Sequence, residues 1–198
     1  MRFFRQRIAR AFVGIWGLAG LVAGCGPRHS VTSPLHIAVL PILDSLPLYV
    51  AQEEGFFADE DLNVALLPAG AAAERDQLLR AKEADGAISD LVAVALANRQ
   101  ERRLVVVRYA MSATPEFPQF RILAAATSRI DTVGDLRGKP IGVSEGTVIE
   151  YVTDRLLRAE GVASDDITVL GVPRIPDRMA LLASGQLEAA TLPEPLAS

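Results

Sequence analysis

The feature that most constrains the fold is a regular alternation of short apolar runs with amphipathic segments, which begins at Leu35. Short apolar runs are typical of buried strands, and a glycine closing a periodic segment, such as Gly55, is typical of a helix C-terminus. Alternation of this kind predicts parallel strands joined by crossover helices, an α/β architecture. The expected strands of the first half cover residues 35–42, 62–67, 86–89 and 104–110, and the expected helices cover 46–54, 71–82 and 91–99.

The second half of the chain repeats this plan. At residues 54–64 and again at 160–169, a helix ends on glycine, an acidic loop follows and a strand begins. Each copy then continues into a helix with paired leucines and a strand of small residues. Chance similarity of common helix–strand patterns is the alternative explanation. We interpret the repeat as two βαβαβ lobes, whose cleft is a typical place for a small ligand.

The proline-rich residues 112–119 and an expected strand at 120–126 separate the two halves, because dense proline is unfavourable to helix. The predicted organisation is lobe 1 at 35–111, an inter-lobe crossing segment at 112–126, lobe 2 at 127–192, and the start of a return to lobe 1 at 193–198.

The N-terminus predicts a lipoprotein leader at residues 1–24. Four arginines precede an apolar run of about 13 residues, which suits a signal peptide and is well short of the ~20 that span a membrane. The run ends in Leu21-Val22-Ala23-Gly24-Cys25, and Cys25 is the only cysteine. This stretch resembles the bacterial lipobox, which implies lipidation of Cys25 and a tether at 25–34. An ordinary secretory leader with a chance cysteine is the alternative.

Charge excludes one class of partner. All 24 acidic residues but only 16 of the 20 basic ones lie from Cys25 onward, which leaves about −8. A nucleic-acid-binding protein needs a basic surface instead, so we expect no nucleic-acid partner. With a single cysteine there is no disulfide, and the fold must depend on core packing.

Two segments carry a family resemblance. Residues 135–143, Asp-Leu-Arg-Gly-Lys-Pro-Ile-Gly-Val, resemble the entry to the second lobe of periplasmic solute-binding proteins, and residues 43–57 are similar to their first strand–helix turn. The nearest branch holds binding proteins for nitrate, alkanesulfonates and thiamine-pyrimidine precursors. The resemblance covers residues 35–194. It implies a two-lobed type II periplasmic-binding-protein fold, with a small organic or oxyanion solute in the inter-lobe cleft.

The same resemblance implies partners and a location. The chain would be the lipid-anchored, extracytoplasmic substrate-binding component of an ABC importer, delivering its solute to a permease, with no metal and no cofactor. Family members usually continue past the strand at 187–192 to complete the first lobe. We therefore interpret the chain as C-terminally incomplete. A broken gene and a differently built first lobe are the alternatives. Apolar surface of lobe 1 would then lie exposed.

Candidate ligand contacts in lobe 1 follow the expected strands, because ligands bind beyond the carboxyl ends of parallel strands and at helix N-termini. Asp44, Ser45 and Leu46 follow the first strand, and Ser89 and Asp90 follow the third. The alternative is that these polar residues only cap the next helix, with Pro47 in its first turn.

In lobe 2 the candidates are Ser144, Gly146 and Thr147, whose amides could hold an oxyanion or carbonyl. Thr147 and Glu150 have capping-box spacing, so capping alone is the alternative. The following helix is expected to bury Val148, Val152 and Leu156 and to expose an Asp154–Arg158 pair. Glu194 is a further candidate beyond the last strand.

The acidic candidates Asp44, Asp90, Glu145 and Glu194 suit a cationic or donor-rich solute. Arg108 and Arg121 could instead serve an anion, although neutralising neighbouring carboxylates is the simpler role. We expect no enzyme: the two histidines, His29 and His36, lie in the tether and at a strand edge, and offer no triad or metal cluster. An enzyme of the thiamine-pyrimidine or menaquinone-precursor type on the same fold, or a non-transport sensor lipoprotein, are the alternatives.

Overall fold

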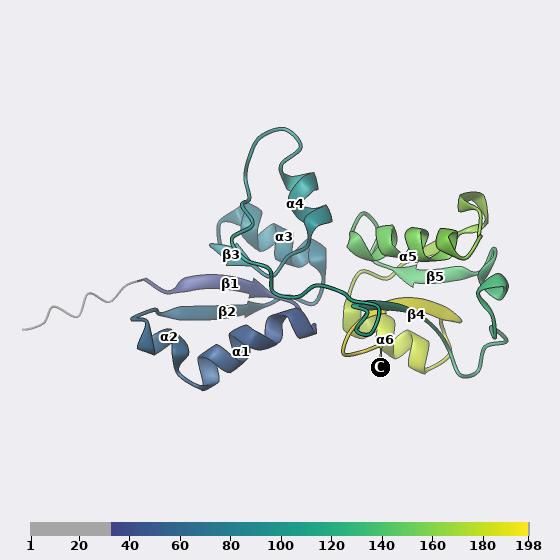
Figure 1. Ribbon diagram of the computed structural model, residues 1–198, viewed down its shortest axis with the longest axis horizontal. Helices are drawn as coiled ribbons and strands as arrows, with labels where there is room; N and C mark the ends of the chain where they lie inside the picture. The colour runs from purple at the N-terminus through teal and green to yellow at the C-terminus, as the bar shows by residue number, and fades with distance from the viewer. Residues whose placement is uncertain (1–32, 198) are drawn as a thin grey trace, which may run out of the picture. The chain divides into compact units, whose positions relative to one another are not determined.

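The computed structural model describes residues 33–197. The expected leader, Cys25 and most of the tether lie outside this range. Residues from Pro34 onward form one compact unit, which contains two separate sheets (Figure 1). No helix within the described range has the length and apolar character needed to span a membrane.

The first sheet has three parallel strands in the order β2-β1-β3. They are β1 (Leu35–Val39), β2 (Val64–Pro68) and β3 (Gly86–Ala87). The chain connects them through α1 (Leu46–Glu53), α2 (Phe56–Asp59) and α3 (Ala72–Ala81), and α4 (Leu91–Ala97) follows β3. This confirms the strand–helix alternation expected up to residue 99. Because the connections move first to one side of β1 and then back across it, right-handed crossovers place their helices on opposite faces of the sheet.

The second sheet has four strands in the order β4-β7-β5-β6. Strands β5 (Pro140–Val143), β6 (Thr168–Gly171) and β7 (Ala189–Pro193) are parallel, while β4 (Phe120–Ala124) runs antiparallel to β7. The crossovers are α5 (Val148–Ala159) and α6 (Ile175–Ala183). Short 3-10 turns lie at Leu43–Ser45, Val133–Leu136 and Ser164–Asp166. The strand expected at 120–126 therefore exists and is an edge of this second sheet.

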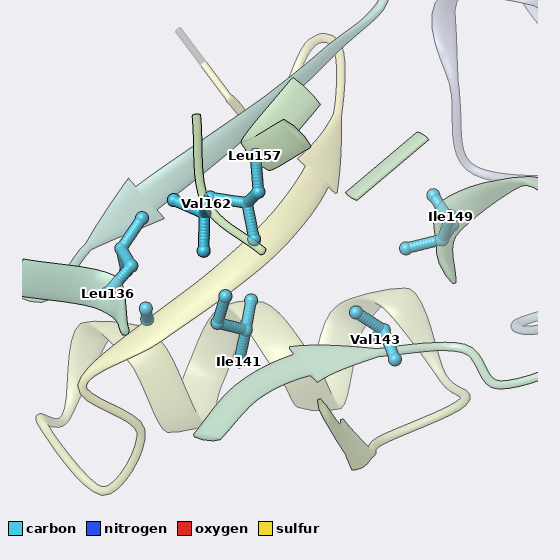
Figure 2. Close-up of a cluster of buried hydrophobic side chains, with 7 residues drawn as sticks. Leu136, Ile141, Val143, Ile149, Leu157 and Val162 are labelled. Carbon is cyan, nitrogen blue, oxygen red and sulfur yellow. The ribbon is translucent and has the colours of Figure 1, made fainter. Parts of the chain in front are cut away.

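The core of the second half is an apolar cluster between α5 and the sheet (Figure 2). Its buried members are Leu136, Ile141, Val143, Ile149, Leu157, Val162 and Ala189. These side chains come from β5, β7, α5, the loop after α5 and the 3-10 turn before β5. Their packing fixes where the N-terminus of α5 lies.

The buried face of α5 differs from the expected one by one residue. The helix buries Ile149, Thr153 and Leu157, whereas Leu156 is 40% exposed and the expected stripe of Val148, Val152 and Leu156 is wrong. A hydrophobic pattern misses the true stripe because a threonine occupies its centre. Thr153 is tolerated there because its hydroxyl makes hydrogen bonds inside the core. The exposed Asp154–Arg158 pair is confirmed at 3.7 Å.

The valine-rich strand expected at 104–110 is also wrong. Between Asn98 and Gln119 the backbone forms neither helix nor strand. The edge of the adjoining sheet at β3 is only two residues long, too short to pair with a run of this length. A strand without a partner gains no ladder hydrogen bonds, whatever its β propensity. Val107, in the middle of this run, is 91% exposed.

Candidate functional site

A hollow of about 60 Å³ lies where residues of the two sheets meet. Its walls come largely from segments that follow strands: β1, β2 and β3 on one side, β5, β6 and β7 on the other. The lining residues are Leu40, Ile42, Asp44, Ala72, Arg75, Ile88, Ser89, Asp90, Phe120, Ser144, Thr147, Val148, Ile149, Ile175 and Pro193. A second hollow of about 470 Å³ shares Asp44, Ile88, Ser89, Asp90, Phe120 and Val148 with the first. We call the two together the cleft.

Asp44 lines both hollows, whereas the next two candidates along the chain, Ser45 and Leu46, line neither. Burial raises the pKa of the Asp44 carboxyl, and the nearby charge of Asp90 adds to this rise. Ser45 precedes α1 as expected, with Pro47 in the first turn, but its hydroxyl makes no cap hydrogen bond. It is fully buried and donates instead to the Leu40 carbonyl at 2.8 Å. Leu46 is 53% exposed. Ser45 thus holds the turn that presents Asp44.

Asp90 has two structural partners. One carboxylate oxygen accepts a hydrogen bond from the Ala93 amide at 2.8 Å, which caps α4, and the other lies 3.4 Å from the Arg75 guanidinium. The capping interpretation of Asp90 is therefore confirmed, although the residue also lines the cleft. The neighbouring Ser89 oxygen is buried and has no hydrogen-bond partner among the described residues. Its hydroxyl is free to bind a ligand.

Arg75 is a residue of the cleft that the sequence did not reveal. It lies in α3, is 1% exposed and lines the smaller hollow. Its guanidinium lies 2.8 Å from Asp76 and 3.4 Å from Asp90. In sequence, Glu74-Arg75-Asp76 has the composition of a solvated helix face. The neighbouring Asp76 supplies one partner of this arginine, and Asp90, at the N-cap of α4, supplies the second partner that the local sequence does not show.

Thr147 caps α5 as expected. Its hydroxyl oxygen accepts a hydrogen bond from the Ile149 amide at 3.2 Å and donates to the Ser144 carbonyl at 2.6 Å. The Glu150 carboxylate accepts from the Gly146 amide at 2.6 Å, one residue earlier than in a standard capping box. Gly146 has φ of +70°, which favours glycine, and lines neither hollow of the cleft. The Gly146 amide is thus already bonded to a carboxylate.

Ser144 is held by a buried arginine. Its hydroxyl donates to the Pro173 carbonyl at 2.8 Å and accepts from Arg178 at 2.9 Å. Arg178 is fully buried and also donates to the carbonyls of Thr191 and Val172, while its Nη2 has no partner within the described range. No carboxylate pairs with it there, and burial lowers the pKa of Arg178 to about 10. No local sequence pattern indicates this role.

Glu194 lies outside both hollows, although the adjacent Pro193 lines the smaller one. Its carboxylate pairs with Arg121 at 2.9 Å. Arg121 therefore neutralises a neighbouring carboxylate, the simpler of the two roles considered for it. Arg108 lines the larger hollow and is exposed.

Three polar contacts join the halves near the cleft. The Leu43 amide donates to the Glu194 carbonyl at 3.2 Å. The Ile175 amide donates to the Gly70 carbonyl at 3.0 Å, and Arg174 lies 3.4 Å from Glu74. Throughout residues 33–197, no group of three or more His, Cys, Asp and Glu side chains is placed to hold a metal ion. The cleft therefore offers one free carboxylate, one free hydroxyl and mainly apolar walls.

A family model described as NMT1/THI5 like matches residues 43–193. No curated relative matches the sequence. Among solved structures, the alkanesulfonate-binding protein SsuA from Xanthomonas axonopodis pv. citri, bound to MOPS, is 19% identical with a TM-score of 0.62, covering 84% of this chain and 56% of its own.

Two further structures are similar. The ligand-binding component of an ABC-type import system from Staphylococcus aureus has a TM-score of 0.68 and 11% identity, covering 83% of this chain and 56% of its own. The periplasmic nitrate-binding protein NrtA from Synechocystis PCC 6803 has a TM-score of 0.57 and 14% identity, covering 83% and 48%. The chain thus spans about half the length of these proteins.

Proposed function

We propose that this chain, which belongs to the NMT1/THI5-like family, is a solute-binding component of an ABC importer that holds a small molecule in the cleft. Its fold is the α/β type II periplasmic-binding-protein fold, as the resemblance of residues 135–143 and 43–57 implied. The whole protein's partners and substrate belong to the proposal: a permease would accept the solute, and nucleic acid would have no part.

The observation that carries the proposal is the cleft itself. Segments after β1 and β3 of one sheet and after β5 of the other converge on it, and ligands bind at this end of parallel strands. Three predicted contacts from separate parts of the chain, Asp44, Ser89 and Thr147, line the same hollow. A solute touching all three would bring the two halves together, and a hinge motion of this kind is typical of two-lobed binding proteins.

The hydrogen bonds of the polar groups in the cleft favour a solute receptor over an enzyme. The hydroxyls of Ser144 and Thr147 each donate to a backbone carbonyl, and Asp90 bonds an amide and an arginine. None of these groups is free to act as a nucleophile or general base. The Asp44 carboxylate and the Ser89 hydroxyl are free, but no histidine within the described range lines either hollow to activate the serine. His36 lies outside the cleft, beside Asp85. We therefore propose a receptor in preference to an enzyme on the same fold or a sensor.

We further propose that Cys25 is lipidated and that the protein lies outside the cytoplasm in the cell envelope. This part of the proposal depends on the lipobox-like stretch before Cys25. Two or more acyl chains would anchor the protein stably, since one chain binds membranes only marginally. Incorporation of labelled palmitate into the parent but not into Cys25→Ser tests it. Equal labelling of both would contradict it.

A pair of matched substitutions in α3 tests the cleft. Ala72 lines the smaller hollow, whereas the next residue, Ala73, is exposed. Ala72→Leu should fill the hollow and abolish solute binding, and Ala73→Leu should leave binding unchanged. A solute at 100 times its Kd stabilises the folded protein by about 2.7 kcal/mol.

The measurement is a thermal-shift screen of the parent against small solutes, repeated on both variants. A stabilisation of that size corresponds to a rise of about 5–10 °C in Tm for a domain of this size. A solute that stabilises the parent and Ala72→Leu equally binds elsewhere and would contradict the proposal. Turnover of a bound solute would favour the enzyme.

A further inference from the structure

We infer that the solute carries a positive charge, an ammonium or amidinium group on a short apolar body, and that the Asp44 carboxylate is its counter-ion. This inference rests on the proposed function, because it assigns a substrate class to the same cleft. Three charged side chains line the smaller hollow, and the protein pairs two of them, Arg75 and Asp90, with each other.

Arg75, the buried cation of the cleft, already has two carboxylate partners. The Arg75 guanidinium lies 2.8 Å from Asp76 and 3.4 Å from Asp90, and only 1% of the residue is exposed. These three side chains together carry one net negative charge. An anionic solute approaching Arg75 would therefore meet a group whose charge is already neutralised, beside a surplus carboxylate.

Backbone amides at the N-termini of α4 and α5 are already bonded to the protein. At α4 the Ala93 amide donates to Asp90, and at α5 the Gly146 amide donates to Glu150. The Ile149 amide donates to the Thr147 hydroxyl oxygen. Carboxylates of the protein thus take the place that a bound oxyanion would need. The Arg178 guanidinium contacts Ser144 and lines neither hollow.

Asp44 is the charge left over. Its carboxylate lines both hollows and has no ion-pair partner among the described residues. The Ser89 oxygen, buried and unpartnered, lines the same two hollows and would accept a hydrogen bond from a solute N–H group. A half-buried carboxylate beside an unused acceptor is complementary to a cationic donor and repels an anion.

The rest of the wall accounts for the apolar body. Ile42, Ile88, Phe120 and Val148 line the smaller hollow, and all but Ile42 also line the larger one. Each methylene of a solute buried against such side chains should raise its affinity about fourfold. A bare inorganic ion would gain nothing from these walls.

Arg108 is the one cation that could reverse the preference. It lines the larger hollow from the irregular segment after α4 and is exposed to solvent. Because it is exposed, its charge is screened more strongly than that of Asp44. A solute with an anionic end would depend on Arg108, and a solute of the class inferred here would not.

The test uses the full chain and four series of probes that share one alkyl body, from ethyl to hexyl: primary alkylammonium ions, alkanesulfonates, alcohols and ω-amino acids. Binding is measured by calorimetric titration to the parent, Asp44→Asn, Arg108→Gln and Ala72→Leu. We expect the ammonium series to bind best and Ala72→Leu to abolish its binding. Asp44→Asn should weaken it at least tenfold and Arg108→Gln less than twofold. Affinity should fall as the pH is lowered through the pKa of Asp44.

The outcomes separate the inference from the function beneath it. Sulfonates or amino acids that bind more tightly than the ammonium ions, lose affinity in Arg108→Gln and are blocked by Ala72→Leu would overturn the cationic class while leaving a solute receptor. Ammonium binding that Asp44→Asn does not weaken would overturn the role of Asp44. Failure of all four series to bind the parent would overturn the inference together with the cleft proposal.

Discussion

The pair of buried threonines between α5 and β7 gives a sharp prediction about what holds the N-terminus of α5 at the cleft. Thr153 and Thr191 are both fully buried, and their hydroxyl oxygens lie 2.7 Å apart. Thr153 also donates to the Ile149 carbonyl at 2.7 Å. A hydroxyl has one proton, so Thr191 must be the donor between the two.

This direction makes the two single substitutions unequal. Thr153→Val removes the only acceptor of the Thr191 proton, and an unsatisfied buried donor costs about 1–3 kcal/mol. Thr191→Val removes one incoming bond from Thr153, whose own proton stays bonded, and should cost about 1 kcal/mol. The double variant replaces both partners with apolar groups of the same shape, and should be about as stable as the parent.

The measurement is a double-mutant cycle by urea unfolding of the parent, both single variants and the double variant. The coupling free energy should be about 2–4 kcal/mol, and Thr153→Val alone should lower Tm by several degrees, about 2–4 °C per kcal/mol. Additive losses would refute the hydrogen bond between the threonines. A larger loss in Thr191→Val than in Thr153→Val would refute the assigned direction of donation.

Two further predictions concern charge. Arg178→Met should lower the free energy of unfolding by about 2 kcal/mol in urea unfolding, because the Val172 and Thr191 carbonyls lose their donor. Part of that loss is offset, because the variant no longer buries the charge whose burial lowers the pKa of Arg178 to about 10. Arg178→Lys should not restore stability, since an ammonium cannot match the guanidinium fork. Asp44→Asn should make the ligand-free protein slightly more stable at neutral pH, by less than about 1 kcal/mol. Burial raises the pKa of Asp44 in the folded state, so its ionisation opposes folding once the pH exceeds its ordinary value of 3.8. The advantage of the variant should vanish as the pH falls toward that value, and a variant that is less stable at pH 7 would contradict the assigned cause.

Local sequence signals were reliable where a residue acts through its own neighbours. The capping roles of Thr147 and Asp90, Pro47 in the first turn of α1 and the Asp154–Arg158 pair all involve partners within four residues along the chain. Helix caps and i,i+4 pairs depend on backbone geometry that the local sequence already specifies. The alternation of strands and helices likewise specified an α/β fold.

The same local reasoning failed where the partner is distant. The run at 104–110 has high β propensity but meets only the two-residue edge strand β3, and the buried stripe of α5 contains Thr153 because Thr191 lies opposite it. A strand is stabilised by its neighbour and a buried hydroxyl by its hydrogen-bond partner, so neither can be judged from the segment alone.

The sequence by itself determined the α/β architecture, the family to which the chain belongs and the loops that could reach a ligand. Only the tertiary structure decided which of those loops share a hollow and which of their charges remain free. Arg178 is buried because acceptors from other elements surround it, and Arg75 adds Asp90 to its neighbour Asp76. The hydroxyls of Ser45 and Ser144 donate to backbone carbonyls and do not cap a helix. The charge balance of the cleft is a property of the assembled site, since a pair such as Arg75–Asp90 forms only when two separate segments are brought within a few ångströms of each other.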